Sequence, residues 1–382
     1  MKLLFACMAI AFVAALRPAA IPDAPPKSEA VIAFTGDLMA HRWQLDDAYD
    51  KETGRYDFDR CFEPVAGYLK EADFTVGNLE TVFAGEGETY SCFPRFNTPD
   101  SYASALKNAG FDFVTNANNH ILDRNWDGAV RTLDVLDENG LGHTGVFRTR
   151  GESLDIYVRE INGIRFALLA FTYGTNGIPV PGDKTWGVNI LDERLIADQI
   201  GAAKKLGPDF IIVLPHMGNE YEEKPSAAYR RWAVFMLEAG ADVVIASHPH
   251  VIQPPEFVRV ADAGGGEREC FIMHSMGNFI SSQRTIPRDA GLLLKMRFEK
   301  TGASAEIKNI SFIPTWVKFV NDKGAYDIQT ISAYDGITSY ENGNPYGLRQ
   351  RDVVRLRQAN DWITEKMLGS AQKLRREYNL LN

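Results

Sequence analysis

Short apolar runs alternate with amphipathic stretches along most of the chain. Runs typical of buried strands are Val31–Phe34, Phe74–Val76, Phe111–Val114, Leu154–Val158, Ile164–Phe171, Phe210–Leu214, Val243–Ala246, Phe257–Val260, Cys270–Met273, Leu292–Phe298, Glu306–Ile313 and Val317–Val320. Helical spacing of apolar residues predicts helices over Phe62–Glu71, Ser101–Ala109, Trp126–Glu138, Leu191–Leu206 and Ala227–Ala239, and one or two within Val353–Arg376. Because helices and strands alternate first and strands then follow one another, we predict a mixed α/β sandwich with two sheets.

Two turns predict hairpins. Asn162-Gly163 joins two of the expected strands, and Asn-Gly between alternating apolar runs is the strongest short-range hairpin signal. Gly264-Gly265-Gly266 separates the runs Phe257–Val260 and Cys270–Met273, which we expect to pair in the same way.

The N-terminus forms a segment of its own. Lys2 precedes Leu3–Leu16, an almost unbroken apolar run below membrane-spanning length, and small residues and prolines follow Arg17. This pattern predicts a secretory signal peptide over residues 1–20, with an uncleaved N-terminal anchor as the alternative. We therefore expect an exported protein, periplasmic or extracellular, or one held at the membrane by its N-terminus. A linker is expected over 21–29, a main domain over 30–320, and a mostly helical C-terminal extension packed on it over 321–382.

Composition and charge narrow the classes of partner. The chain has 382 residues, 45% hydrophobic and 24% charged, which is the balance of a globular protein with a large core. Its net charge is −9, from 41 basic and 50 acidic residues without a basic cluster, and this argues against nucleic acid as a partner. Once a signal leaves, Cys61, Cys92 and Cys270 remain. A Cys61–Cys92 disulfide and three buried free thiols are both compatible with that odd number.

Side chains able to hold a metal follow five of the expected strands: Asp37; Asn78 and Glu80; Asn119 and His120; His216; His248 and His250. Taken alone, an aspartate such as Asp37 is more often a turn or helix-capping residue than a metal ligand. A pair such as Asn119-His120, taken alone, is more often part of a loop that hydrogen-bonds its own backbone. Two imidazoles flanking Pro249 rarely serve packing. Six of the seven histidines lie in or just after such loops, namely His41, His120, His216, His248, His250 and His274, whereas His143 does not.

These strand ends are expected to meet. Ligands of open α/β sheets gather outside the carboxyl ends of the strands, where several loops converge. A mixture of carboxylate, amide and imidazole groups suits Mn, Fe or Zn better than Ca or Mg alone. The set offers more ligands than one ion needs, so we expect two divalent ions that clamp a phosphate and activate a water.

Six motifs in one order resemble those of the CapA-type capsule and poly-γ-glutamate synthesis proteins, the PGA_cap family. They are Thr-Gly-Asp37-Leu-Met, Gly-Asn78-Leu-Glu80-Thr, Asn116-Ala-Asn-Asn119-His120-Ile-Leu-Asp123, Pro-His216-Met-Gly-Asn-Glu220-Tyr221, Ser-His248-Pro-His250-Val-Ile-Gln253-Pro and Ser275-Met-Gly-Asn278-Phe279. The resemblance covers roughly residues 30–285. It implies a fold similar to calcineurin-like metallophosphoesterases, a four-layer α/β/β/α sandwich with two mixed β-sheets.

The resemblance also implies a role for each matching residue. Asp37 would be a metal carboxylate, Glu80 or Asn78 would take the place of the bridging carboxylate, and Asn119 would bind metal through its amide oxygen. His120 would protonate the leaving group or hold the phosphate. The remaining metal ligands would be His216, His248 and His250, and the supporting residues Asp123, Glu220 and Asn278.

Two departures from the phosphoesterase pattern matter. Met39 stands where a ligand histidine is usual, and a thioether is a poor ligand for a hard ion. His41, two residues on, is the expected substitute. Asn78 stands where an aspartate is usual, which leaves Glu80 to bridge, so one of the two sites is weakened or absent.

Two functions remain open at this level. The first is a metal-dependent hydrolase of a phosphoester or related bond, linked to capsule or poly-γ-glutamate synthesis. The second is a non-hydrolytic subunit that binds or transfers a polyanionic, poly-γ-glutamate-like chain beside other subunits of a membrane synthase. The retained His120 favours chemistry, whereas Met39 and Asn78 favour binding.

Overall fold

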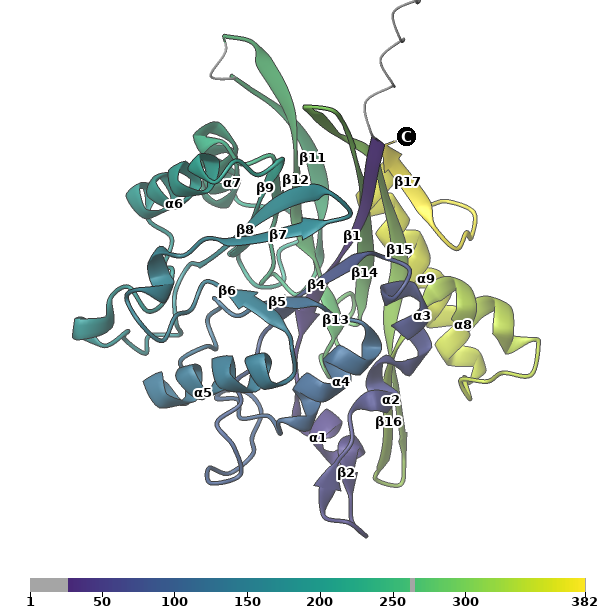
Figure 1. Ribbon diagram of the computed structural model, residues 1–382. Coiled ribbons are helices and arrows are strands. Elements are labelled where there is room, and N and C mark those ends of the chain that lie inside the picture. Colours follow the sequence, from purple (N-terminus) through teal and green to yellow (C-terminus); the bar gives the residue numbers. More distant parts are fainter. Residues whose placement is uncertain (1–26, 262–264, 382) are drawn as a thin grey trace, which may run out of the picture.

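Two mixed β-sheets face each other at the centre of the molecule (Figure 1). The computed structural model describes residues 27–261 and 265–381. The first sheet has the order β16-β15-β14-β1-β4-β5-β6, with β13 beside β1 and β17 beside β15. Its strands are β1 (Lys27–Leu38), β4 (Phe74–Leu79), β5 (Phe113–Thr115), β6 (Gly142–Thr144), β13 (Asn278–Ile280), β14 (Ala290–Thr301), β15 (Ser304–Asp322), β16 (Ala325–Ser332) and β17 (Tyr378–Leu381).

The second sheet has the order β11-β12-β10-β9-β8-β7. Its strands are β7 (Tyr157–Ile161), β8 (Ile164–Thr172), β9 (Phe210–His216), β10 (Val243–Ile245), β11 (Ile252–Ala261) and β12 (Glu267–Met276). Both sheets are mixed, because β1 runs antiparallel to β14 but parallel to β4, and β8 runs parallel to β9 but antiparallel to β7. The predicted sandwich of two mixed sheets is therefore confirmed.

The alternation of side chains along each strand divides the core into three parts. In β1, Ile32 and Phe34 face the central core between the sheets, whereas Ala33 faces outward. Helices α1 (Arg42–Ala48), α2 (Asp59–Phe62), α3 (Ala66–Leu69), α4 (Ser101–Ala109) and α5 (Asn125–Glu138) lie along the outer side of the first sheet. Helices α6 (Glu193–Lys205) and α7 (Ala227–Ala239) cover the second sheet, and α8 (Ala333–Tyr340) and α9 (Gln350–Leu368) pack against the central core. This gives the expected α/β/β/α layering.

The Asn162-Gly163 turn sets the register of its hairpin. Both residues have positive φ, 51° and 83°, and Ile161 pairs directly with Ile164. Strand β7 therefore runs up to the turn and begins at Tyr157, so the expected strand over Leu154–Val158 was placed too early. The second hairpin is confirmed by the antiparallel pairing of β11 with β12.

Pro64 divides the expected helix over Phe62–Glu71. The segment consists of α2, a 3-10 turn over Glu63–Val65 with the proline near its start, and α3. A proline lacks the N–H for an interior helical hydrogen bond, so the helix is interrupted although Phe62 and Leu69 remain buried.

The ends of the expected main domain fall inside strands. β1 begins at Lys27, within the expected linker, and residue 320 lies within β15. The expected strands Glu306–Ile313 and Val317–Val320 form one continuous strand, β15. Pro314 does not interrupt it, because this residue lies between the stretch that pairs with β17 and the stretch that pairs with β16, where a missing N–H is tolerated. β16 and β17 join the first sheet, and α9 is one helix that ends at Gly369.

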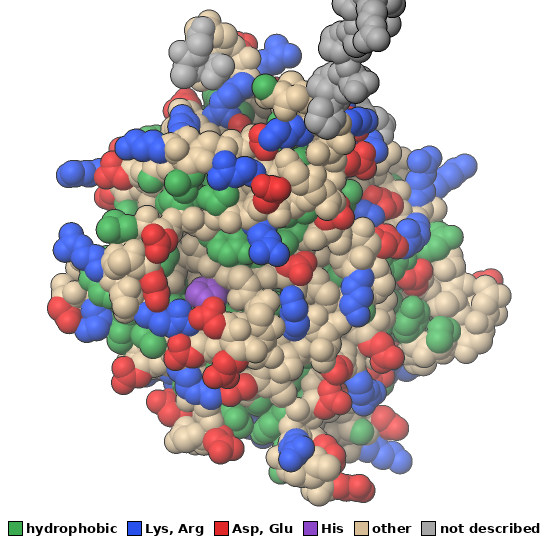
Figure 2. Space-filling view, viewed as in Figure 1, with side chains coloured by type: hydrophobic (Ala, Val, Ile, Leu, Met, Phe, Trp, Pro, Cys, Tyr) green, Lys and Arg blue, Asp and Glu red, His purple; other side chains and the backbone are tan. Residues whose placement is uncertain are grey.

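The expected signal peptide or anchor over residues 1–20 lies outside the described residues. Within the described part, no helix is long and apolar enough to cross a membrane. Cys61, Cys92 and Cys270 are all free thiols, so the Cys61–Cys92 disulfide does not form: Cys61 is a buried residue of α2, and Cys92 lies on a surface loop. Acidic and basic side chains are interspersed over the face shown in Figure 2.

Candidate metal centre

The strand ends converge at one edge of the two sheets. β1 and β4 are parallel neighbours with Asp37 beside Asn78, and β13 places Asn278 on the other side of Asp37. In the second sheet His216 ends β9 and pairs with Ser247, which follows β10 and precedes His248. The predicted convergence of loops far apart in sequence is therefore present in the structure.

Asp37 is the centre of a buried polar network. Its Oδ1 accepts a hydrogen bond from Asn78 Nδ2 at 2.8 Å, and its Oδ2 lies 2.9 Å from His250 Nδ1. Asn78 Nδ2 also lies 3.2 Å from His216 Nδ1, while Asn78 Oδ1 accepts from Thr115 Oγ1 at 3.0 Å. The amide oxygen of Asn78 thus bonds to Thr115, and its nitrogen faces Asp37 and His216.

Glu80 is a buried carboxylate without a hydrogen-bond donor. Neither of its oxygens has a partner among the described residues, although Oε1 lies 3.7 Å from His216 Nε2 and 3.6 Å from His250 Nε2. Burial, and next the nearby Asp37 carboxylate, raise the pKa of Glu80 well above its usual value. An unpaired buried carboxylate is costly, so the placement of Glu80 between two imidazoles suits it to binding a cation.

Three imidazoles surround this carboxylate. The His248 ring lies 4.7 Å from that of His216 and 5.9 Å from that of His250. Burial and the neighbouring imidazoles lower the pKa of His216 well below its usual value and that of His248 to about 3. The rings of His216 and His248 are therefore neutral near pH 7, as metal ligands must be.

The His-Pro-His loop is held in an unusual backbone conformation. His248 and His250 have φ values of 107° and 59°, where residues other than glycine are uncommon. His248 Nδ1 is buried without a partner among the described residues. Such strain is characteristic of functional sites, and here it directs both imidazoles toward the network around Glu80.

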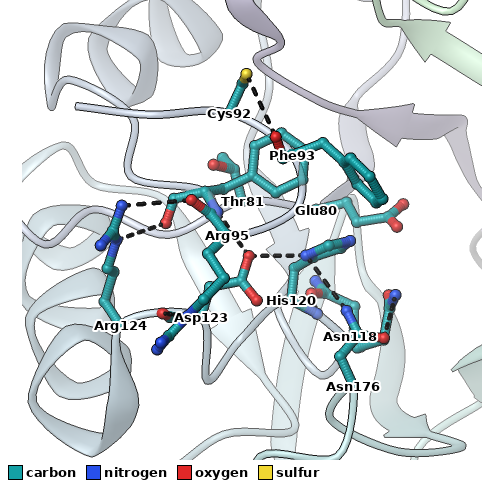
Figure 3. Close-up of polar contacts among 12 residues, drawn as sticks. Glu80, Thr81, Cys92, Phe93, Arg95, Asn118, His120, Asp123, Arg124 and Asn176 are labelled. Carbon is teal, nitrogen blue, oxygen red and sulfur yellow. Dashed lines mark hydrogen bonds and ion pairs between the residues drawn. The ribbon is translucent and has the colours of Figure 1, made fainter. Parts of the chain in front are cut away.

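His120 is held on the other side of the site by the loop after β5. Its Nδ1 lies 2.7 Å from Asp123 Oδ2 (Figure 3), and its backbone N–H donates to Asn118 Oδ1 at 3.1 Å. Its ring packs edge-on against Phe96. Because Asp123 occupies Nδ1, Nε2 is the nitrogen left to meet a substrate. Asn119 Oδ1 lies 2.7 Å from His216 Nε2, which joins this loop to the histidine cluster.

The donor groups fit metal ions. Three groups of potential ligand atoms lie within 4.8 Å of one another: Asp37, Glu80 and His250; Glu80, His216 and His248; and Glu220, His248 and His250. The first two share Glu80, as expected of a residue that bridges two ions. Both oxygens of Glu80 and Nδ1 of His248 have no hydrogen-bond partner among the described residues, and a set of carboxylates and imidazoles suits divalent transition metals.

The remaining predicted residues differ in their surroundings. Asn278 Nδ2 donates to Arg288 O at 2.8 Å, and its Oδ1 is buried without a partner in the described structure. His41 is outside the three groups: its Nδ1 accepts from Ser282 N at 3.3 Å, and burial lowers its pKa to about 3. The substitution of His41 for the histidine at Met39 stays a prediction. His274 was misplaced, since it lies in β12 with Glu256 at 3.2 Å.

Sequence reasoning missed the loop after β8. Asn176 accepts from Asn119 Nδ2 at 3.1 Å through its own Oδ1, and its Nδ2 lies 3.5 Å from His120 Nδ1. The Tyr173 ring lies 4.7 Å from that of His248. The signal was available, because this loop also follows the carboxyl end of a buried strand.

Comparison with known proteins identifies the family of the chain. The model of the bacterial capsule synthesis protein family PGA_cap matches residues 31–283. The capsule biosynthesis protein CapA of Bacillus anthracis is 29% identical over 271 residues, 69% of this chain and 62% of that protein. The PGA biosynthesis protein CapA of Bacillus subtilis is 28% identical over 265 residues, 68% of this chain and 66% of its own length. The matched part of the chain thus spans less than two-thirds of each relative.

Similar solved structures include two bacterial proteins. The Haemophilus influenzae NAD nucleotidase has a TM-score of 0.46 and 14% identity over 78% of this chain and 52% of its own. The calcineurin-like phosphoesterase YfkN of Bacillus subtilis has a TM-score of 0.43 and 15% identity over 76% of this chain and 91% of its own. Both the TM-scores and the sequence identities are low. The family assignment rests instead on the match over residues 31–283, which is well over half of the 382 residues. The chain therefore belongs to the PGA_cap family of bacterial capsule synthesis proteins.

Proposed function

We propose that this protein is an exported, metal-dependent hydrolase of a phosphoester or related bond that acts in capsule or poly-γ-glutamate synthesis. The observation that carries the proposal is Glu80, a buried carboxylate with no hydrogen-bond donor, placed between His216 and His250. The ligands of the metal would be Asp37, Glu80, Asn119, His216, His248 and His250. Bound Mn, Fe or Zn ions would supply positive charge for the scissile group and lower the pKa of a coordinated water.

The protein's own residues supply orientation and a proton. Asp123 fixes the His120 ring through Nδ1 at 2.7 Å, and Phe96 packs against that ring, so Nε2 is held ready to protonate a leaving group. Asn176 and Asn119 connect the His120 loop to His216. The proton donor and the ligand cluster are thus kept in a fixed relation.

One observation favours a second function, in which the protein binds or transfers a polyanionic chain without hydrolysis as part of a membrane synthase. Asn78 stands where a bridging aspartate is usual in phosphoesterases, and its oxygen bonds to Thr115 rather than facing the ligands. One of the two ion sites would then lack a carboxylate. A single ion binds an anion well but activates water less strongly than a pair.

His120→Asn separates these functions. Asparagine cannot transfer the proton, so turnover of bis-p-nitrophenyl phosphate by the metal-loaded protein should fall at least about 100-fold. Metal content, measured by plasma mass spectrometry, should stay unchanged because His120 is not in any of the three ligand groups. Equal loss of metal would make His120 a ligand instead.

His143→Asn is the matched control. His143 pairs with Asp137 at 3.1 Å outside the ligand cluster, so this variant should retain both metal and turnover. Wild-type protein that holds metal but hydrolyses neither phosphodiesters nor phosphomonoesters would favour the binding function.

A further inference from the structure

A cavity of about 860 Å³ lies beside the proposed metal centre. Its walls are α1, the small hairpin of β2 (Tyr49–Asp50) and β3 (Arg55–Tyr56), and the loop over residues 90–95. A volume of this order is typical of a small-molecule site. None of the residues assigned to the metal centre lines this cavity.

The cavity is basic. Four of its lining residues carry positive charge, Arg42, Lys51, Arg95 and Arg124, and only Asp46 is acidic. Arg42 is paired with Asp46, and Arg124 donates to Phe96 O and lies 3.4 Å from Glu88. Such pairs hold their charges in place and leave little attraction for a ligand.

Two of the cations are not neutralised. Lys51 has no ion pair or hydrogen bond within the described structure, and Arg95 uses only Nε, which donates to Asp123 O at 2.7 Å. The two terminal nitrogens of Arg95 therefore remain as donors. In a chain with net charge −9, free cations gathered in a cavity are a local exception, and they favour an anionic ligand.

Tyrosines form an adjoining apolar wall. The ring of Tyr56 lies 5.0 Å from that of Tyr49 and 5.4 Å from that of Tyr90, and no hydroxyl of the three has a hydrogen-bond partner within residues 27–261 and 265–381. Phe93 is 65% exposed at the rim. Rings of this kind contact hydrocarbon or sugar, while their hydroxyls donate to anions.

This cavity is connected to His120 through direct contacts. Arg95 bonds to the backbone of Asp123, whose carboxylate holds the His120 ring, and Figure 3 shows Arg95 and Phe93 beside that pair. On the other side Phe96 packs against both His41 and His120, and Arg42 directly follows His41. Arg95 therefore lies at the boundary between the cavity and the loop that holds His120.

We propose that the cavity is an anion subsite, in which Lys51, Arg95 and the tyrosines bind carboxylate or phosphate groups carried on an apolar or sugar frame. The assignment of the cavity as part of the substrate site rests on the proposed function of the metal centre. The binding of anions in the cavity does not depend on that function. The subsite would hold the part of the molecule that does not react, so that binding energy positions the reacting bond.

Calorimetric titration of the metal-loaded, full-length protein tests this assignment. Two probes distinguish the source of the anion: a hexaglutamate peptide carries carboxylates, and fructose 1,6-bisphosphate carries phosphates on a sugar. Lys51→Glu should weaken binding of the better probe at least tenfold at low salt, and Lys51→Gln should weaken it by less, with both losses shrinking as salt rises. Lys51 is exposed on a hairpin, so all variants should fold like the wild type.

Lys205→Glu is the matched control. It makes the same charge change at the exposed end of α6, on the second sheet, and should leave the affinity unchanged. Equal affinity of Lys51→Glu and Lys205→Glu for both probes, or no binding of either probe to the wild type, would overturn the assignment. His250→Ala separates the two proposals. A variant that loses metal yet keeps the Lys51-dependent binding would support both the metal centre and the subsite. A wild-type protein that binds no metal but binds the probes through Lys51 would contradict the metal centre and support the subsite.

Discussion

Individual residues at the strand ends determine what the centre can do. Glu80 and His248 carry buried polar atoms without hydrogen-bond partners in the described structure. A folded protein tolerates such atoms when a bound ligand supplies the partner. Asp37, in contrast, is satisfied by Asn78 and His250. The motifs could name these residues in advance, but only the structure shows which atoms remain unpaired.

Asn78→Asp tests the effect of an asparagine at the position where phosphoesterases usually have an aspartate. Without metal, a second carboxylate 2.8 Å from Asp37 replaces a hydrogen bond with repulsion, so the free energy of unfolding should fall by about 2 kcal/mol. With Mn²⁺ the added charge should raise metal affinity, so the metal-dependent increase in Tm should exceed that of the wild type. Thermal unfolding with and without Mn²⁺ measures both effects.

Asn379→Asp serves as the control, because Asn379 is exposed on β17 far from the centre. It should alter neither the metal-free Tm nor the response to Mn²⁺. An Asn78→Asp protein that is as stable as the wild type without metal would show that Asn78 does not lie against Asp37 as described.

At the scale of elements, local signals predicted hairpins and helices better than boundaries. Asn162-Gly163 specified both a turn and its register, because positive φ at both positions permits few alternatives. β16, α8 and β17 were missed, since their stability comes from pairing with β15 and packing on the core rather than from a pattern of their own. Pro64 was passed over because the apolar spacing around it is helical.

Helix α9 braces a loop next to the centre. Its Arg355 contacts both oxygens of Asp289, which also accepts from Trp316 Nε1 at 2.9 Å. Residue Arg288 of the same loop accepts the hydrogen bond from Asn278 and lies over the Tyr221 ring at 3.2 Å. The C-terminal helix is thus connected to the site through a buried ion pair.

Arg355→Ala should lower the free energy of unfolding by about 3 kcal/mol, because it leaves the buried Asp289 carboxylate without its countercharge. Urea unfolding followed by circular dichroism measures the change. Arg351→Ala is the control: this side chain is 72% exposed and 4.0 Å from Asp352, so its loss should cost less than about 0.5 kcal/mol. Equal costs would contradict the bracing role of α9.

For the whole molecule, the sequence predicted the layers and the meeting of the strand ends, since parallel strands bring their carboxyl ends to one edge. It did not predict that Asn176 and Tyr173 would complete the site, because they follow β8 outside the six motifs. It also missed the basic cavity, whose residues come from α1, a hairpin and the 90–95 loop and share no linear pattern. Such surfaces arise only when distant segments pack together.

The central claim is that Glu80 and the imidazoles around it hold metal. The most direct test is elemental analysis of the purified protein, after loading with Mn²⁺ or Zn²⁺ and dialysis, beside Glu80→Gln and the exposed control Glu86→Gln. We predict roughly one to two equivalents of metal in the wild type and in Glu86→Gln, and a loss of most of it in Glu80→Gln. A wild-type protein without bound metal, or a Glu80→Gln protein that retains as much as the wild type, would contradict the account.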